Sequence, residues 1–358
     1  MKQVFTKNLM HWHQTSNHRQ MPWKGEKDAY KIWLSEIILQ QTRVEQGWNY
    51  YERFIKTYPK IEALAAAKDQ EVFKLWEGLG YYNRCKNLLH TARTIVQEHQ
   101  GQFPHDYETI LSLKGVGPYT AAAIASFAFQ LPYAVVDGNV FRVLSRYFNI
   151  ADPIDGNTGK QKFTQLAQEV LDHGQPGIYN QAIMDFGATV CKPFAPSCGI
   201  CPLQKNCQAF ANGLVNELPV KEKKLLKRKR WFNYFFFEHA GQIYIHQRTQ
   251  GDIWANLHEF YLVESPDQVP WNNETVLELL QDQLGVKTGV VKAVSEVLVQ
   301  QLTHQQIKAR FVQVVLNKKP MLLTKGQWVA KKSIDQLAFP KIILQWMENA
   351  RPLRDGGF

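Results

Sequence analysis

Four cysteines carry the strongest chemical signal in the chain. They follow the spacing C-x6-C-x2-C-x5-C in the stretch CKPFAPSCGICPLQKNC, at Cys191, Cys198, Cys201 and Cys207. Three prolines and a glycine within the stretch prevent a long helix, so we predict a loop wrapped around a metal centre. Soft thiolate ligands favour zinc or an iron-sulfur cluster, and the spacing alone leaves both open. A disulfide pair is a third interpretation, less expected because the chain shows no secretory signal.

The first candidate acid is Glu36, in the sequence WLSEIILQQ. Apolar residues lie one helical turn before and after it, so its carboxyl group is expected to be partly removed from water. Burial disfavours the charged form and raises the pKa, as a general acid working near neutral pH requires. A single Glu on a helix is more often a solvated surface charge, and that alternative stays open.

The second candidate acid is Asp137, between the apolar run YAVV and the sequence GNVFRVL. An Asp between an apolar run and a new helix is typical of an N-cap, because its carboxylate accepts from the first free backbone N–H groups. On this pattern alone Asp137 is interpreted as structural.

Residues 111–129, LSLKGVGPYTAAAIASFAF, predict a helix-hairpin-helix. Gly115 and Gly117 flank Val116 in a tight turn, Pro118 suits the first position of the next helix, and the alanines allow close helix packing. We expect the turn to leave outward-pointing N–H groups that attract phosphate without reading a base. A close-packed helix corner with no ligand is the alternative.

Composition limits the class of protein. The chain has 358 residues, 45% of them hydrophobic, which is enough for two or three domains with their own cores. No apolar leader or membrane-length run is present, so an intracellular, reducing location is expected. A formal charge of +10 favours a polyanionic partner such as nucleic acid. The fifth cysteine, Cys85, is interpreted as an ordinary buried thiol.

Helical patterns occupy the chain to about residue 215, with Gly47 interpreted as a break between two helices and Tyr81 and Tyr82 as exposed aromatics in a turn. The run KEKKLLKRKR at 221–230 has seven basic residues against one acid and is typical of a solvated linker, or of an import signal. Beyond it, a hairpin-like alternation, a helix ending at Gly285 and further strands predict an α+β domain. Residues 351–358 are expected to form a loose tail.

Four motifs follow one another along the chain: Glu36 in LSEIILQQT, the LKGVGPYTAAAI hairpin, VVDGNVFRVLSR and the cysteine loop. Together they resemble the endonuclease III superfamily, and within it the MutY branch of adenine DNA glycosylases, over nearly the whole chain. The resemblance implies a mostly α N-terminal part with a helix-hairpin-helix glycosylase fold, followed by an α+β Nudix-like C-terminal domain. In this organisation residues 1–215 are the catalytic domain, with a cluster subdomain (1–20 and 133–215, cysteine loop at 191–207) and a six-helix subdomain (21–132). Residues 216–230 are the basic linker and residues 231–350 the Nudix-like domain.

The resemblance also implies roles at the reaction centre. It assigns proton delivery to adenine to Glu36 and stabilisation of the sugar cation to Asp137, with supporting roles for Tyr119 and Asn139. Lyase members have a nucleophilic lysine where this chain has Tyr119, so a monofunctional enzyme that leaves an abasic site is expected. By the same resemblance the four cysteines become ligands of a [4Fe-4S] cluster.

Further positions match the family's substrate contacts. The residues that match its adenine pocket are Met21, Trp23, Lys24 and Gln181. The residues that match its DNA-binding positions are Gln41, Tyr81, Gly115, Val116 and Gly117. Because the target base must leave the duplex, Gln41 and Tyr81 are expected to fill the stack. Each of these residues has ordinary packing as its alternative, and many family members have Arg where Lys24 stands.

The C-terminal part resembles the Nudix-like module that MutY proteins share with 8-oxo-dGTP pyrophosphatases. The hydrolytic Nudix box largely fails, since Glu278 and Asp282 leave too few carboxylates for magnesium, so we expect binding without hydrolysis. The loop Leu302, Thr303 and His304 is expected to recognise 8-oxoguanine, where family members commonly have Phe-Ser-His. A hairpin turn without a ligand is the alternative.

The expected partner is double-stranded DNA containing adenine opposite 8-oxoguanine or guanine. The enzyme is expected to be a monomer without a membrane partner, in the cytoplasm of a bacterium, close to the nucleoid. Two alternatives remain at this point. One is a bifunctional lyase similar to endonuclease III, and the other is a lesion-binding protein without catalysis.

Overall fold

A computed structural model describes residues 1–222, 227–249, 251–286 and 288–350. The chain divides into a first unit, residues 1–66 and 86–224, and a second unit, residues 67–85 and 225–358. The domain boundaries expected from the sequence stay predictions, and the expected tail and linker residues 223–226 lie outside the described residues. No helix in the described ranges combines the length and apolar character needed to cross a membrane.

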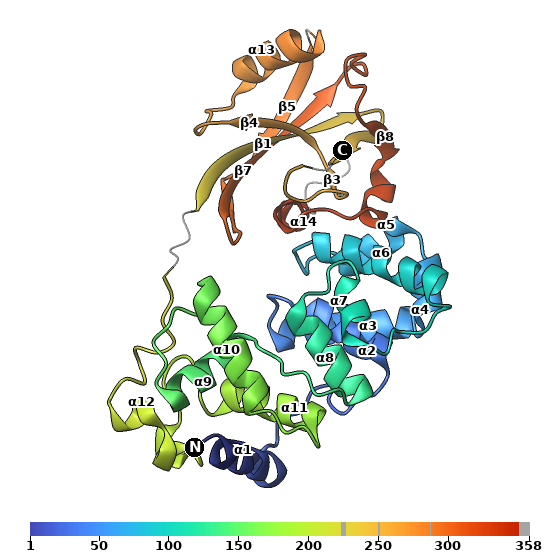
Figure 1. Ribbon diagram of the computed structural model, residues 1–358. Helices are drawn as coiled ribbons and strands as arrows, with labels where there is room; N and C mark the ends of the chain where they lie inside the picture. Colours follow the sequence, from blue (N-terminus) through green and yellow to red (C-terminus); the bar gives the residue numbers. More distant parts are fainter. Residues whose placement is uncertain (223–226, 250, 287, 351–358) are drawn as a thin grey trace. The chain divides into compact units, whose positions relative to one another are not determined.

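The first unit is helical, as predicted (Figure 1). Its α-helices are α1 (Lys2–Ser16), α2 (Ala29–Leu39), α3 (Val44–Thr57), α4 (Ile61–Ala66), α6 (Asn83–Glu98, which begins in the second unit), α7 (Tyr107–Ser112), α8 (Pro118–Phe129), α9 (Gly138–Phe148), α10 (Asn157–Glu169), α11 (Pro176–Thr189) and α12 (Gln208–Ala211). Two 3-10 turns, η1 (Cys198–Ile200) and η2 (Gln204–Asn206), lie within the cysteine loop.

One helix boundary differs from the sequence prediction. Gly47 does not break a helix, because it lies buried inside α3. A Cβ atom at this position would come within 2.8 Å of Leu39 Cδ2, so the glycine lets α3 approach the end of α2. The break falls instead between Leu39 and Val44.

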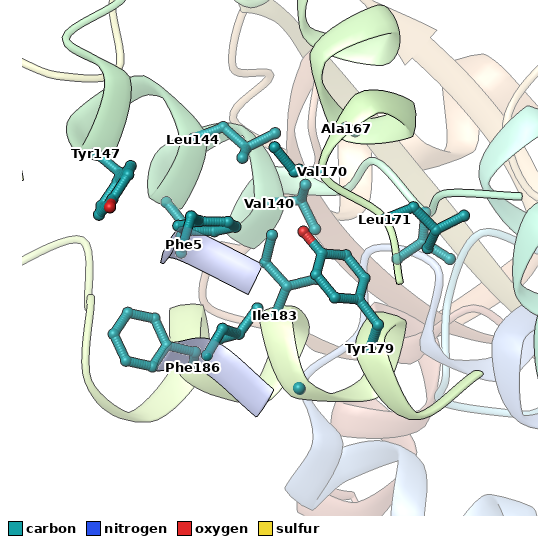
Figure 2. Close-up of a cluster of buried hydrophobic side chains, with 14 of the residues drawn as sticks. Phe5, Val140, Leu144, Tyr147, Ala167, Val170, Leu171, Tyr179, Ile183 and Phe186 are labelled. Atoms are coloured by element: carbon teal, nitrogen blue, oxygen red, sulfur yellow. The ribbon is translucent and has the colours of Figure 1, made fainter. Parts of the chain in front are cut away.

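A hydrophobic cluster joins α1 to α9, α10 and α11. Phe5 projects from α1 into side chains that α9, α10 and α11 supply (Figure 2). Its ring centroid lies 4.8 Å from that of Tyr147. Burial of large apolar side chains such as these contributes about 1.5–3 kcal/mol each. The cluster therefore holds α9 and α11, which carry several candidate site residues, at a fixed separation.

The helix-hairpin-helix forms as predicted, with α7 and α8 joined by a short turn and Pro118 at the first position of α8. Gly115 has φ +81°, and a Cβ there would lie 2.8 Å from Asn87 Cβ, so the turn requires glycine. The Val116 N–H is not free, contrary to the expectation for this turn, because it donates to Leu113 O at 3.0 Å.

The second unit has a mixed sheet, which confirms the predicted α+β class. The path of hydrogen-bonded strands runs β3-β2-β1-β7-β5, with β4 paired to β1, β6 to β7 and β8 to β2. The strands are β1 (Arg228–His239), β2 (Gln242–Gln247), β3 (His258–Glu259), β4 (Tyr261–Ser265), β5 (Gly289–Val294), β6 (Leu298–Gln301), β7 (Gln305–Leu316) and β8 (Gln327–Ala330). The remaining elements are α5 (Asp69–Trp76), α13 (Asn273–Leu284), η3 (Lys331–Gln336) and α14 (Lys341–Asn349).

The α13 helix packs on this sheet and ends at Gly285, as the sequence predicts (Figure 1). The predicted hairpin is the antiparallel pair β1 and β2, although β1 also pairs in parallel with β7. Because β1 begins at Arg228, the last three residues of the basic run belong to a strand. In the turn after α5, Tyr81 is 45% exposed but Tyr82 is 7% exposed, so the prediction of two exposed tyrosines is wrong for Tyr82.

Candidate functional site

A cavity of about 340 Å³ opens in the first unit. This volume lies within the usual range of pockets that bind small molecules. The cavity is lined from the segment before α2, from α2 itself and from the starts of α8, α9 and α11. The residues predicted for the reaction and for the adenine pocket all line it: Met21, Trp23, Lys24, Glu36, Tyr119, Asp137, Asn139 and Gln181. Side chains spread over 160 positions of sequence therefore share one wall.

Glu36 lies on α2 and is 6% exposed, which confirms the predicted burial. Burial raises the pKa of this carboxyl to about 7, the nearby Tyr119 hydroxyl opposes the shift, and the Asp137 charge adds to it. A carboxylic acid with this pKa is about half protonated at pH 7 and faces a cavity into which it can release the proton.

Tyr119 occupies the second position of α8, where Gly117 caps the helix. Its hydroxyl donates to Met184 Sδ at 3.4 Å. Burial and the neighbouring acids raise the pKa of Tyr119 well above its ordinary value, so the phenol remains neutral. A neutral phenol next to Glu36 can stabilise the carboxylate left after proton transfer, but it offers no amine for a Schiff base.

Asp137 is both the N-cap of α9 and a wall of the cavity. Its Oδ1 accepts from Asn139 N at 2.9 Å and from Val140 N at 2.8 Å, and its Oδ2 accepts from Asn139 Nδ2 at 2.7 Å. Burial raises the pKa of Asp137, while these donors and Arg142 hold the rise back. The capping predicted from sequence is confirmed, and it fixes the carboxylate toward the cavity.

Asn139 connects this carboxylate to the cysteine loop through Arg142. Arg142 Nη2 donates to Asn139 Oδ1 at 2.7 Å, and Arg142 Nε donates to Cys191 O at 2.7 Å. The same guanidinium donates to Gly187 O at 2.7 Å. Because Asn139 Nδ2 donates to Asp137 while its Oδ1 accepts from Arg142, the Asn139 amide is held in one orientation.

The candidate adenine pocket has an aromatic side and a charged side. Met21 and Trp23 are buried, with the Trp23 ring 5.3 Å from that of Tyr51 in an edge-on arrangement. Lys24 lines the cavity, but its ammonium group donates to Arg19 O at 2.7 Å and lies 3.3 Å from Asp185 Oδ2. The lysine is therefore held at the wall by protein groups.

Sequence reasoning missed four residues of this wall or its support: His13, Arg19, Met184 and Asp185. Asp185 lies four residues after Gln181 on α11, so helical spacing alone would have placed the two side chains on one face. Arg19 and His13 carry no comparable signal, because only the tertiary fold brings the end of α1 to α11.

The four cysteines of the loop line one small cavity together with Arg146. All are free thiols and partly buried. Arg146 Nη1 lies 3.5 Å from Cys191 Sγ, and the same side chain donates to Lys192 O at 2.7 Å. Among the described residues, no group of three or more His, Cys, Asp or Glu side chains is already arranged around a single ion. Four converging thiols beside a guanidinium are nevertheless a donor set that suits an anionic metal-thiolate centre.

Of the other predicted DNA contacts, Gln41 and Tyr81 are exposed, whereas Val116 of the hairpin turn is buried at 7% exposure. Gln41 directly follows the end of α2, is exposed and has φ 56°, so it projects from a turn. In the second unit, the Tyr81 hydroxyl lies 2.6 Å from Thr303 Oγ1. Leu302, Thr303 and His304 form the turn between β6 and β7, closed by the Leu302 N–H donating to Gln305 O at 2.8 Å. Arg228 N donates to His304 O at 2.9 Å, which ties the turn to the first residue of β1.

Two sets of acids in the second unit have different surroundings. Glu278 and Asp282 of the predicted Nudix-box region lie exposed on α13. The acid that the sequence did not single out, Glu259, is 3% exposed and accepts from Arg248 Nη1 at 2.5 Å and from Tyr234 Oη at 3.1 Å. A neighbouring cluster joins Arg230 to Asp252 at 2.7 Å and to Glu264 at 2.6 Å.

Comparison with known proteins agrees with this arrangement. Residues 34–171 match the HhH-GPD superfamily base excision DNA repair protein family, and residues 233–349 match the NUDIX domain. A solved thermostable thymine-DNA glycosylase is similar over 59% of this chain and 97% of its own, with a TM-score of 0.55 and 30% identity. The fold and the cavity thus define a helix-hairpin-helix DNA glycosylase.

Relatives in sequence indicate which kind of DNA glycosylase the chain resembles. The adenine DNA glycosylase of Buchnera aphidicola subsp. Schizaphis graminum is 36% identical over 256 residues, which span 71% of this chain and 73% of the relative. The adenine DNA glycosylase of Mus musculus is 41% identical over 228 residues, 60% of this chain and 44% of the relative. The chain belongs to the adenine DNA glycosylase family, and it is accordingly a hydrolase that acts on DNA in base excision repair.

Proposed function

We propose that this protein is a monofunctional glycosylase that removes adenine paired with 8-oxoguanine, and also with guanine, from double-stranded DNA. The observation that carries the proposal is the buried Glu36, whose pKa is raised to about 7, in a cavity shared with Asp137. Adenine is a poor leaving group until its ring is protonated, and Glu36 is an acid able to protonate it near neutral pH.

The proposed chemistry divides the work between the two carboxyl groups. Glu36 donates its proton to the extruded adenine, which weakens the N-glycosidic bond. Asp137 stays close to the sugar and stabilises the positive charge that develops on it, because its own hydrogen bonds hold the carboxylate in place. Water then completes the hydrolysis and leaves an abasic site. With a neutral phenol at Tyr119, no covalent lyase step follows.

Base extrusion and lesion recognition belong to the exposed turns. We propose that Gln41 and Tyr81 fill the space that the extruded adenine leaves and that the hairpin turn binds backbone phosphate through Gly115 and Gly117. The turn formed by Leu302, Thr303 and His304 would recognise 8-oxoguanine through its hydroxyl and imidazole groups. The hydrogen bond between Tyr81 and Thr303 supports a shared role for these two predicted contacts.

The four cysteines are proposed to hold a [4Fe-4S] cluster. Cys191, Cys198, Cys201 and Cys207 would supply the thiolates, and Arg146 would compensate part of their charge. When bound, the cluster supplies a rigid core that orders residues 186–210, and hydrolysis requires no electron from it. Iron and sulfide analysis with a broad visible absorbance tests the assignment. A colourless protein that contains zinc would overturn it.

A substrate panel tests the proposed activity. Single-turnover reactions use duplexes with adenine opposite 8-oxoguanine, adenine opposite guanine, and thymine glycol, each with and without alkali. We expect adenine release from the first two duplexes, fastest from the first, with strand breaks mainly after alkali. Cleavage of the thymine glycol duplex alone, or breaks in equal amounts without alkali, would favour the lyase alternative. Binding without release would favour the lesion-binding alternative.

Assembly and location are part of the same proposal. We propose that the protein acts as a monomer in the bacterial cytoplasm, close to the nucleoid. Light scattering of the purified protein should give the mass of one chain, 41.4 kDa. Cell fractionation should recover the protein with the soluble and nucleoid fractions, and recovery with membranes would contradict the location.

A further inference from the structure

One buried carboxylate behind the cavity wall takes no part in the proposed reaction. Asp185 on α11 is 0% exposed. Its Oδ1 accepts from Arg19 Nη1 at 2.9 Å and from Gln181 Nε2 at 3.0 Å. Its Oδ2 accepts from Asn17 Nδ2 at 2.8 Å and lies 3.3 Å from Lys24 Nζ. All the hydrogen-bonding directions of this carboxylate are therefore used by Asn17 and by three residues that line the cavity, Arg19, Lys24 and Gln181.

The contact with Asp185 determines which end of the Gln181 amide faces the cavity. A glutamine amide has a donor end and an acceptor end, whereas an ionised carboxylate only accepts. Asp185 is ion-paired with Arg19 and Lys24, so it can hold only the NH2 end of Gln181. Among the described residues Gln181 Oε1 accepts no hydrogen bond, so this acceptor is available to a group inside the cavity that Gln181 lines.

We propose that Asp185 is a positioning residue for base specificity, which holds Gln181 so that its Oε1 accepts a hydrogen bond from the 6-amino group of the extruded adenine. This inference rests on the proposed function. A purine with oxygen at C6 would place one acceptor against another, which costs binding of the wrong base. Discrimination then depends on the fixed orientation of one amide.

The local fold explains why the orientation is held. Gln181 and Asp185 are four residues apart on α11, so they lie on one face of the helix. Arg19 and Asn17 come from the segment that follows α1 and fix Asp185 from the other side. A carboxylate pinned by two elements cannot rotate to release Gln181, which is the support that a preorganised site requires.

The substitution Asp185→Asn tests the inference, because an asparagine can donate to Gln181 Oε1 and allow the amide to turn over. Single-turnover rates are measured with adenine, purine or hypoxanthine opposite 8-oxoguanine, each relative to the wild-type rate on the same duplex. Loss of one charge-assisted hydrogen bond predicts a fall of roughly tenfold for adenine. The rate for purine, which carries no group at C6, should hardly change, and the rate for hypoxanthine should not fall.

Exchanging the carboxylate and the amide between positions 181 and 185 should restore the base preference. In the double variant Gln181→Glu with Asp185→Asn, one carboxylate remains near Arg19 and Lys24, and the new amide can donate to the new carboxylate. An acceptor then always faces the cavity. We expect the preference for adenine over hypoxanthine to return to within roughly a factor of three of wild type.

The outcomes separate this inference from a structural role and from the proposed function. An equal loss with all three bases in Asp185→Asn, at an unchanged melting temperature, would overturn the inference. If that variant does not fold, Gln181→Ala decides, since the inference requires it to lower the ratio of adenine to purine rates, and an unchanged ratio contradicts it. A wild-type protein that releases no adenine would instead overturn the proposed function.

Discussion

Each unit of the molecule buries a glutamate, and the two glutamates have opposite surroundings. In the first unit the groups that act on Glu36 are a neutral phenol and another acid, and its pKa is raised to about 7. In the second unit Glu259 is equally buried but accepts from Arg248 at 2.5 Å and from Tyr234 at 3.1 Å. One acid is placed where it can exchange a proton, and the other forms part of a closed network.

The contrast between Glu36 and Glu259 separates two uses of a buried carboxyl group. A buried carboxyl group without a neighbouring cation is costly to ionise. Such a group is therefore typical of a functional site at which its proton is transferred. A buried carboxylate paired with arginine holds elements together, and removal of one partner leaves an uncompensated charge. Substitutions in the two units should therefore separate activity from stability.

The largest effect is expected for Glu36→Gln. The amide keeps the shape of the side chain but supplies no acidic proton, so single-turnover adenine release should fall by roughly a thousandfold or more. Because burial already disfavours the charged form of the replaced carboxyl group, a neutral amide should not lower the melting temperature. If the variant retains a tenth of the wild-type rate, Glu36 does not deliver the proton.

Asp137→Asn separates capping from catalysis. Asparagine caps helices about as well as aspartate, so the free energy of unfolding should change little. The negative charge beside the sugar is lost, and adenine release should fall about a hundredfold to a thousandfold. Urea unfolding of the variant measures the capping role, and its single-turnover rate measures the catalytic role. A large loss of stability with a small loss of rate would restrict Asp137 to the cap.

Arg248→Met should show the reverse pattern. It leaves Glu259 buried without its arginine and, among the described residues, with only the His246 ring, 3.0 Å from its Oε1, as a basic partner, so the second unit should lose about 3–5 kcal/mol of unfolding free energy in urea. Lys331→Met is the matched control, because its ion pair with Glu238 spans 3.5 Å with both side chains about a third exposed. The control should cost about 1 kcal/mol or less. Equal losses in both variants would contradict the distinction between the two kinds of pair.

The smallest effect is expected for Thr303→Val. The substitution keeps the branched shape but removes the hydroxyl that lies 2.6 Å from Tyr81 Oη. The ratio of rates with 8-oxoguanine and with guanine opposite adenine should fall by a few-fold, up to about tenfold. Thr288→Val, at an exposed position outside the turn, is the control. An unchanged ratio would show that this hydroxyl does not contribute to recognition.

The sequence predicted features that local patterns encode. The cap at Asp137, the turn at Gly115 and the burial of Glu36 each follow from a few neighbouring residues. The order of the four motifs, through their resemblance to a known family, predicts roles that no single pattern carries, and it predicts that Glu36 and Asp137 share one site.

The features that the sequence did not predict depend on tertiary contacts. Gly47 resembles a helix break in the sequence, but its lack of a side chain makes room for the Leu39 side chain against α3. Asp185 and Arg19 meet only because α1 packs beside α11, and Arg248 and Glu259 meet only when the sheet forms. Charged residues in such pairs have no distinctive neighbours in sequence, so a surface position is the default expectation for each of them.

The dependence of the wild-type single-turnover rate on pH tests the central claim most directly. If protonated Glu36 delivers the proton, adenine release should be constant below a pH of about 7 and fall by about tenfold per unit above it, because the pKa of the carboxyl is raised to about 7. Duplex binding measured over the same range corrects for any loss of affinity. A rate that stays constant or rises from pH 6 to about 9 with binding intact would contradict the assignment of Glu36 as the acid.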